Sequence, residues 1–379
     1  MKLNKNVKIP ISLYRIFSRA YFHLPFMVIY LYKIGFNLIT IELIMAVYGM
    51  AVFLYTKFPP NAKPIFYLPC KYVLLLSEIL KCIGMLLIVF TQNVVGICIA
   101  QIFLGFGYGV AAGCDTQIIN YHIDDGGKFQ AHSNSFMFVS LLVAGLVGSV
   151  LFDRDIYYPF IASAIADFIT IIVCVALPGE PGKISKINKR ELRNKLSYQE
   201  KSLVCMYCLT RGIILTFFTV FLPYHLFIDL NIPIYGFIAI LTSYTFLGNM
   251  SSNFLAGRLK KKYAVKTMNI CLLVSLIMYF SNNLAMIVMA TILLGLTSGA
   301  TRPICLNELR RNNSNVAMVS NIMESIYSVV NIVLLILGGI LYYFGGYIYM
   351  HMLFAFVYVI YIILYLIFLK RSKAYEKQG

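Results

Sequence analysis

Apolar residues dominate this chain in long runs, which short polar or basic segments separate. Most of the runs are close to the ~20 residues that a helix needs to cross the hydrocarbon core of a membrane. The twelve runs cover residues 20–34, 39–56, 72–90, 94–114, 134–152, 156–177, 203–226, 234–255, 267–281, 284–301, 316–341 and 347–369. Because lipid cannot hydrogen-bond to the backbone, spanning segments of this length form helices. We therefore predict an all-α polytopic membrane protein with twelve transmembrane helices.

The longest polar segment divides these runs six and six. It extends from residue 178 to 202, opens with Pro178 and Gly179, and carries seven Lys or Arg. This composition is typical of a linker. We predict an N-terminal six-helix bundle at 1–182, a cytoplasmic linker at 183–201 and a C-terminal six-helix bundle at 202–379.

Basic residues are concentrated in every second loop. Of the 32 Lys and Arg, 28 lie on one side of the membrane when the runs are threaded through it, so the positive-inside rule places both termini and the linker in the cytoplasm. A content of 60% hydrophobic and 12% charged residues excludes a soluble domain. The net charge of +17 is spread over short loops, which predicts contact with membrane lipid and no nucleic-acid partner. We expect a multi-pass protein of the cell (inner) membrane.

Enzyme signatures are missing from the sequence. Neither H-E-x-x-H nor G-x-x-x-x-G-K-[ST] occurs, and the five His residues are scattered. We expect no catalytic residues, no metal site and no cofactor. An intramembrane enzyme or a channel stays as the alternative from a different class.

The loop after the eighth run carries the basic sequence Gly257-Arg258-Leu259-Lys260-Lys261-Lys262. It resembles the inter-helix motif of the major facilitator superfamily, Gly-x-Leu-Ala-Asp-Arg-x-Gly-Arg-Lys, although Lys261 stands at the motif's Asp. Segments 113–121 and 302–311 resemble the family's stretches after its fourth and tenth helices. The resemblance implies two bundles that alternate access to a central site. It also implies a gating loop formed by Gly257, Arg258, Lys261 and Lys262.

Ionisable residues within the runs are the candidates for a functional site, because charge is costly in lipid and normally faces a partner or an aqueous cavity. Lys81 and Asp167 lie at similar depth in the third and sixth runs, and Glu78 lies one turn from Lys81. Helices three and six are peripheral supports in the resembled fold. We interpret Lys81 and Asp167 as a structural buried pair, with Glu78 as its neighbour.

Four further residues are assigned to a proton and substrate pathway. Arg211 and Glu324 each lie eight residues from the inner ends of the seventh and eleventh runs. In the resembled fold these helices border the central cavity. Asp115 and Arg302 lie near the inner ends of the fourth and tenth runs.

Resemblance to bacterial drug-efflux members of that family leads to the functional expectation. We expect a monomeric, proton-coupled secondary transporter, an antiporter that exports a small organic compound or drug. The alternative is an importer of a sugar, peptide or siderophore. The expected partners are a small-molecule substrate, protons and membrane lipid. Arg211 would suit an anionic group and Glu324 a cation, so the substrate class stays open at this point.

Overall fold

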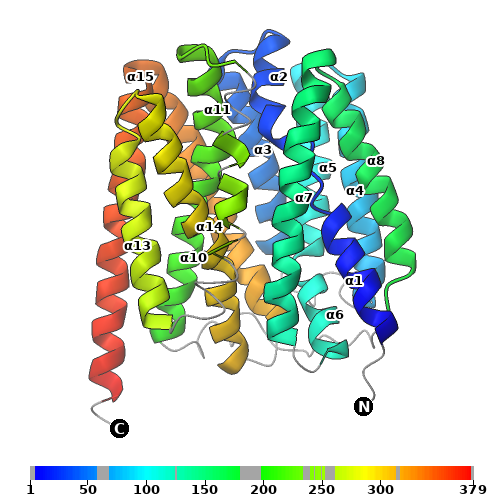
Figure 1. The fold of residues 1–379 in the computed structure, drawn as a ribbon, viewed down its shortest axis with the longest axis vertical. Coiled ribbons are helices and arrows are strands. Elements are labelled where there is room, and N and C mark those ends of the chain that lie inside the picture. Colours follow the sequence, from blue (N-terminus) through cyan, green and yellow to red (C-terminus); the bar gives the residue numbers. More distant parts are fainter. Residues whose placement is uncertain are drawn as a thin grey trace.

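Long helices run side by side through the molecule (Figure 1). The computed structural model describes residues 5–57, 68–123, 126–179, 198–233, 240–242, 244–248, 250–251, 261–312 and 316–376. Within these ranges every regular element is helical, so the predicted all-α class is confirmed. The start of the first helix and the end of the last lie at the same end of the bundle (Figure 1).

The first half of the chain forms the bundle on the right of Figure 1. Its elements are α1 (Lys5–Phe17), the short helix η1 (Leu24–Phe26), α2 (Met27–Lys33), α3 (Leu38–Lys57), α4 (Cys70–Phe90), α5 (Val94–Ala111), α6 (Cys114–His122), α7 (Gly126–Arg154) and α8 (Tyr158–Val175).

In its described residues, the second half contains one continuous helical segment, helical residues at 240–242, 244–248 and 250–251, and three further helices. The segment consists of α10 (Tyr198–Thr216), the wide π-helical turns η4 (Phe217–Phe221) and η5 (His225–Asp229), and α11 (Leu222–Tyr224) between them. The further helices are α13 (Lys261–Met278), α14 (Leu284–Asn312) and α15 (Val316–Glu376). A left-handed Gly346, with φ of 68°, interrupts α15 and divides it into the last two predicted runs.

Membrane-spanning segments match the predicted runs closely. Within the described ranges, eight helices are long and apolar enough to cross a membrane, and two shorter apolar helices cover 24–33 and 263–278. The eighth predicted run, 234–255, is described only in part. Residues 183–197 of the predicted linker lie outside the described residues, so the division into domains at this point stays a prediction.

A helix precedes the first predicted run, which the sequence analysis did not expect. Residues 5–17 form α1, which packs against α7 and α8. The chain then runs without helix through residues 18–23 and continues as η1 and α2. Basic residues lower the hydropathy of α1, but Arg15 is buried because Asp115 pairs with it at 2.8 Å. A buried charge with such a partner is tolerated.

Glycines set the spacing between helices of the first bundle. A Cβ atom on Gly105 of α5 would lie 2.6 Å from the carbonyl oxygen of Tyr48 on α3. One on Gly107 would lie 2.9 Å from the carbonyl oxygen of Ser77 on α4, whose hydroxyl donates to the Gly107 carbonyl at 2.7 Å. Small residues therefore let these backbones approach closely, as they do in many membrane helix pairs.

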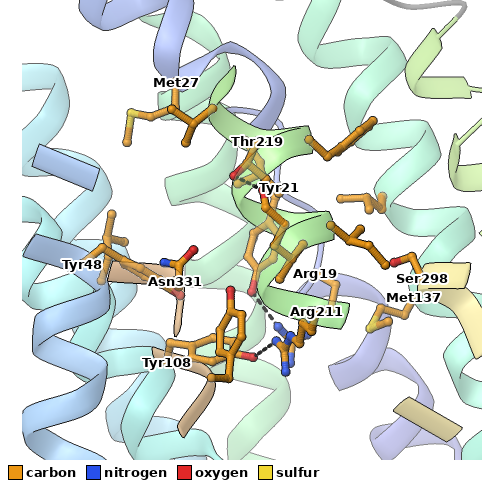
Figure 2. Close-up of a pocket in the computed structure, with 18 of the residues that line it drawn as sticks. Arg19, Tyr21, Met27, Tyr48, Tyr108, Met137, Arg211, Thr219, Ser298 and Asn331 are labelled. Carbon is orange, nitrogen blue, oxygen red and sulfur yellow. Dashed lines mark hydrogen bonds between the residues drawn. The ribbon is translucent and has the colours of Figure 1, made fainter. Parts of the chain in front are cut away.

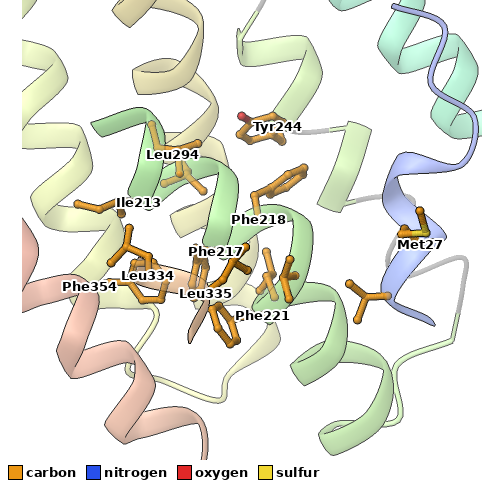
Figure 3. Close-up of a cluster of buried hydrophobic side chains, with 14 of the residues drawn as sticks. Met27, Ile213, Phe217, Phe218, Phe221, Tyr244, Leu294, Leu334, Leu335 and Phe354 are labelled. Carbon is orange, nitrogen blue, oxygen red and sulfur yellow. The ribbon is translucent and has the colours of Figure 1, made fainter. Parts of the chain in front are cut away.

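An aromatic core fills the second bundle around the π-helical turn η4. Phe217 and Phe221 are fully buried and contact Phe354 of α15, with ring centroids 5.7 and 5.8 Å apart (Figure 3). Phe218 points the other way and stacks on Tyr244 at 3.9 Å. The wide turn thus directs one aromatic ring toward the space between the bundles and its neighbours into the core.

The two bundles meet along α3 and α15, α2 and α11, and α7 and α14. At the end of the molecule that the charge pattern predicts to face outward, Lys33 lies over the ring of Phe227 at 5.8 Å. Tyr32 and Tyr224 make an edge contact with centroids 5.9 Å apart. These contacts join the two bundles at that end.

Candidate functional site

A cavity of about 320 Å³ lies between the two bundles (Figure 2). Helices of both halves supply its wall, from Arg19 in the break of the first crossing to Leu335 on α15. The charged side chains that line it are Arg19, Lys81, Asp167, Arg211 and Arg302. Its size is at the lower end of the range for ligand pockets, about 300–1,000 Å³.

Arg211 is the centre of a cluster that joins α10, α15 and α5. Its guanidinium lies 2.5 Å from Glu324 Oε1, and Tyr207 also donates to that oxygen at 2.8 Å. Arg211 further donates to the hydroxyls of Tyr207 and Tyr108. The ring of Tyr327 faces the guanidinium at 4.5 Å. Sequence analysis placed Arg211 and Glu324 on one pathway, and the structure brings them into direct contact.

Tyr108 connects this cluster to the first bundle. Its hydroxyl donates to Glu324 Oε2 at 3.5 Å. The same hydroxyl accepts a hydrogen bond from Arg211 (Figure 2). Arg211 and Glu324 belong to the second bundle, whereas Tyr108 is on α5 of the first. Any movement that separates the bundles at this depth breaks these bonds.

Lys81 forms a second buried cluster within the first bundle. Its Nζ lies 2.5 Å from Glu78 Oε2 and 3.7 Å from Asp167 Oδ1. Tyr14 of α1 donates to Glu78 at 3.3 Å. The closer partner of Lys81 is thus Glu78, although sequence analysis emphasised Asp167. Lys81 and Asp167 also line the cavity, so this cluster is part of its wall.

Asp115 and Arg302, the other predicted pathway residues, do not bind each other. Asp115 pairs with Arg15 of α1 at 2.8 Å and does not line the cavity, within the residues described. Arg302 of α14 lines the cavity beside Ser298 and Gly299. Gly257 and Arg258 of the predicted gating loop lie outside the described residues. Lys261 and Lys262 begin α13, and their side chains are not described.

Arg19 is a site residue that sequence analysis missed. It lies in the non-helical segment between α1 and η1, and its guanidinium donates to the hydroxyl of Tyr21 at 3.0 Å. The Tyr21 and Tyr108 rings lie 5.9 and 5.6 Å from its Cζ. Because residues before 20 were assigned to a loop, Arg19 counted only as a topology signal. A break in a helix that would otherwise span the membrane is the signal that could have identified it.

Tyrosines of the wall were missed for a different reason. Tyr48, Tyr108, Tyr207 and Tyr327 line the cavity, but a Tyr within an apolar run carries no charge and was not considered as a site residue. Tyr207 and Tyr108 lie one on each bundle and both accept a hydrogen bond from Arg211. Only the three-dimensional structure shows this pairing with the partly buried Arg211.

The chain resembles known proteins both in sequence and in fold. A family model described as Major Facilitator Superfamily matches residues 202–379. No curated protein matches the sequence.

Solved structures match over nearly the whole chain. The human organic anion transporter MFSD10 (TETRAN) is 10% identical with a TM-score of 0.68, over 96% of this chain and 100% of that one. A variant of the nucleoside transporter NupG is 13% identical with a TM-score of 0.71, over 97% of this chain and 99% of that one. At such identities the likeness shows the fold. The predicted fold of this superfamily is thereby confirmed, and the family match to the second half supports the superfamily.

Proposed function

We propose that this chain is a secondary transporter of the major facilitator superfamily that exports a small organic compound in exchange for protons. The cavity of about 320 Å³ between the bundles carries the proposal, because both halves supply its wall. A site built in this way is reached from either side when the bundles rock against each other. An enzyme site would need a nucleophile or an acid–base pair aimed at a bound substrate.

The contacts between the bundles support alternating access. Lys33 over Phe227 and Tyr32 against Tyr224 join the bundles at the end that the charge pattern predicts to face outward, and we assign them to the outer gate. Tyr32 and Lys33 are exposed and their partners are partly exposed, so opening these contacts costs little compared with the rupture of a packed core. The cavity below them would then open to the outside.

Proton coupling is assigned to Glu324, with Arg211 as its partner in the closed state. Arg211 and Tyr207 bind one oxygen of Glu324, and Tyr108 binds the other. When the bundles separate, Tyr108 leaves with the first bundle and Glu324 loses one of its donors. An arginine does not readily release its own proton, so the proposal assigns proton exchange to Glu324.

Reconstitution into liposomes with an internal pH-sensitive dye tests the proposal. An added compound that is a substrate should change the internal pH in vesicles that contain the protein, and protein-free vesicles should show no such change. A protonophore should abolish accumulation against a gradient. A broad panel of small organic compounds that elicits neither proton movement nor exchange would contradict the proposal. The direction of the proton flux relative to the substrate separates the exporter from an importer.

A further inference from the structure

Two guanidiniums of the cavity have no carboxylate at ion-pair distance. In the described part of the chain, Lys81 is paired with Glu78 and Asp167, and Arg211 with Glu324. Among the same residues, no ion pair is formed by Arg19 or Arg302. Asp115 interacts electrostatically with both, but at 2.8 Å it is bound to Arg15.

This arrangement leaves positive charge in a confined space. Four cationic side chains line the cavity, and two of them, Lys81 and Arg211, are paired with carboxylates. The paired carboxylates number three: Asp167, Glu78 and Glu324. The pair of Arg15 and Asp115 adds no net charge. Arg19 and Arg302 are both partly buried, and a partly desolvated cation without a carboxylate partner favours a ligand that brings a negative charge. A surplus of one charge fits a singly charged anion such as a carboxylate. A phosphate monoester, with a charge of about −1.5 to −2, fits less well.

The ring of Tyr108 lies near two arginines of the cavity. Arg19 Cζ lies 5.6 Å from the Tyr108 ring centroid, and Arg211 Cζ lies 5.9 Å from the same centroid (Figure 2). Arg19 comes from the first bundle and Arg211 from the second. The Tyr108 ring therefore lies beside charges from both bundles, where it can contact the body of a ligand whose charged group Arg19 binds.

The remaining wall is mostly apolar. Met27, Met45, Met85, Met137 and Leu104 line it, and Phe218 lies on the side of the second bundle. Methionine side chains are flexible and polarisable, so they adapt to hydrocarbon bodies of different shape. The wall of the cavity thus combines two unpaired guanidiniums with an adaptable apolar surface.

We infer that the cavity selects small amphipathic organic anions, with the anionic group held by Arg19 and Arg302 and the carbon body against Tyr108 and the methionine wall. This inference rests on the proposed transport function and adds the substrate class to it. Arginine is well suited to the task, because its planar fork binds a carboxylate through two hydrogen bonds.

Matched ligands test the selection. The purified protein is titrated in detergent with 4-phenylbutyrate, 4-phenylbutanol and 4-phenylbutylamine, which share one body and differ in charge. The same three head groups on butyl and naphthylmethyl bodies form two further sets. Binding is followed as the shift of the unfolding temperature with a thiol-reactive dye, for which the chain offers nine free cysteines. Carboxylates should raise the unfolding temperature, and the alcohols and amines should leave it unchanged.

Substitutions locate the anion. Arg19→Gln and Arg302→Gln should each weaken carboxylate binding about tenfold to hundredfold, the range for a charge-assisted hydrogen bond. Arg19→Lys keeps the charge and should retain part of the affinity. Arg154→Gln is the matched control, since Arg154 is exposed at the end of α7 and should bind carboxylates like the unaltered protein. If Arg19→Gln does not fold, Arg19→Lys and Arg302→Gln carry the test.

The outcomes separate this inference from the proposed function. Binding of amines or alcohols as tight as that of carboxylates overturns the inference, as does full affinity in both glutamine variants or no binding of any carboxylate. Carboxylates that bind in detergent but are never moved across liposome membranes would leave the anion site standing and refute transport. Transport of neutral or cationic compounds alone would leave the transport function standing and refute the anion site.

Discussion

Lys81 shows how a single buried charge depends on its partners. Glu78 at 2.5 Å is the closer carboxylate and Asp167 at 3.7 Å the more distant one. Removal of Lys81 leaves two carboxylates without their cation, whereas removal of the Asp167 charge leaves the Lys81–Glu78 pair intact. The three side chains therefore differ in what their loss does to the fold.

We expect Lys81→Met to lower the free energy of unfolding by about 3–5 kcal/mol, the cost of breaking a buried pair. Asp167→Asn should cost clearly less. Adding Glu78→Gln to Lys81→Met should recover more stability than adding Asp167→Asn. Thermal unfolding of the purified variants checks this order. Equal losses for Lys81→Met and Asp167→Asn, or strict additivity in both double variants, would show that the distances do not describe the energetics.

Glu324 is the residue whose charge the mechanism requires to change. Glu324→Gln should abolish transport driven by a pH gradient, because the amide cannot exchange a proton, while substrate binding and passive exchange persist. Arg211→Ala should shift the pH dependence of transport as well as weaken it, since Arg211 binds the carboxylate at 2.5 Å. Proteoliposome uptake with and without a pH gradient measures both. Gradient-driven accumulation by Glu324→Gln would refute this role and direct attention to Asp115.

At the scale of elements, the contact between α3 and α15 is the main joint between the bundles. Gly339 of α15 lies directly against the buried side chain of Glu42 on α3, with no room for a Cβ atom between them. Close approach of the two helices at this point thus depends on a glycine.

Gly339→Ala should push α15 away from α3 and lower the free energy of unfolding by about 1–3 kcal/mol, as overpacking does elsewhere. Gly179→Ala is the control, because a Cβ atom at Gly179 meets nothing within 4 Å. Thermal unfolding of both variants in detergent provides the measurement. A Gly339→Ala protein as stable as the control would mean that the joint is looser than the structure indicates.

Much of the helix arrangement could be predicted from the sequence, because lipid demands long apolar helices and hydropathy reports them directly. In the described residues, helices of the structure coincide with eleven of the twelve predicted runs. Helix α1 was missed because Lys5, Lys8 and Arg15 reduce its hydropathy, and only the fold supplies the acidic partner of Arg15. The break after α1, which carries Arg19, was missed with it.

The candidate site was predictable only for charges in the middle of apolar runs. Arg211 and Glu324 stood out in this way, and the structure places them in contact. Tyr108 and Tyr207 gave no such signal, since a tyrosine in a transmembrane run is ordinary. Asp115 and Arg302 share a depth in the sequence pattern, but α1 inserts Arg15 as the actual partner of Asp115. Depth alone does not reveal which helix faces which.

For the whole molecule, the charge pattern predicts orientation. The structure places the start of α1 and the end of α15 at the same end of the bundle (Figure 1). A reporter that works only in the cytoplasm should be active when fused at Lys189 or after Lys377, because 28 of 32 basic residues lie on that predicted side. Efficient activity of a reporter that works only outside, at either position, would contradict the twelve-helix topology.

Alternating access is the central claim, and a reversible lock on the outer contact tests it most directly. The lock joins the two bundles at the point where Lys33 Nζ lies 5.8 Å from the Phe227 ring. A protein without its native cysteines carries Lys33→Cys and Phe227→Cys, and a short reducible cross-linker connects the two new thiols. Gln92→Cys with Tyr157→Cys, within the first bundle and 2.5 Å apart at their native side chains, is the control. The cross-bundle lock should stop transport, preserve ligand binding and release transport on reduction, while the control stays active. Undiminished transport by the fully cross-linked Lys33–Phe227 protein would contradict the account.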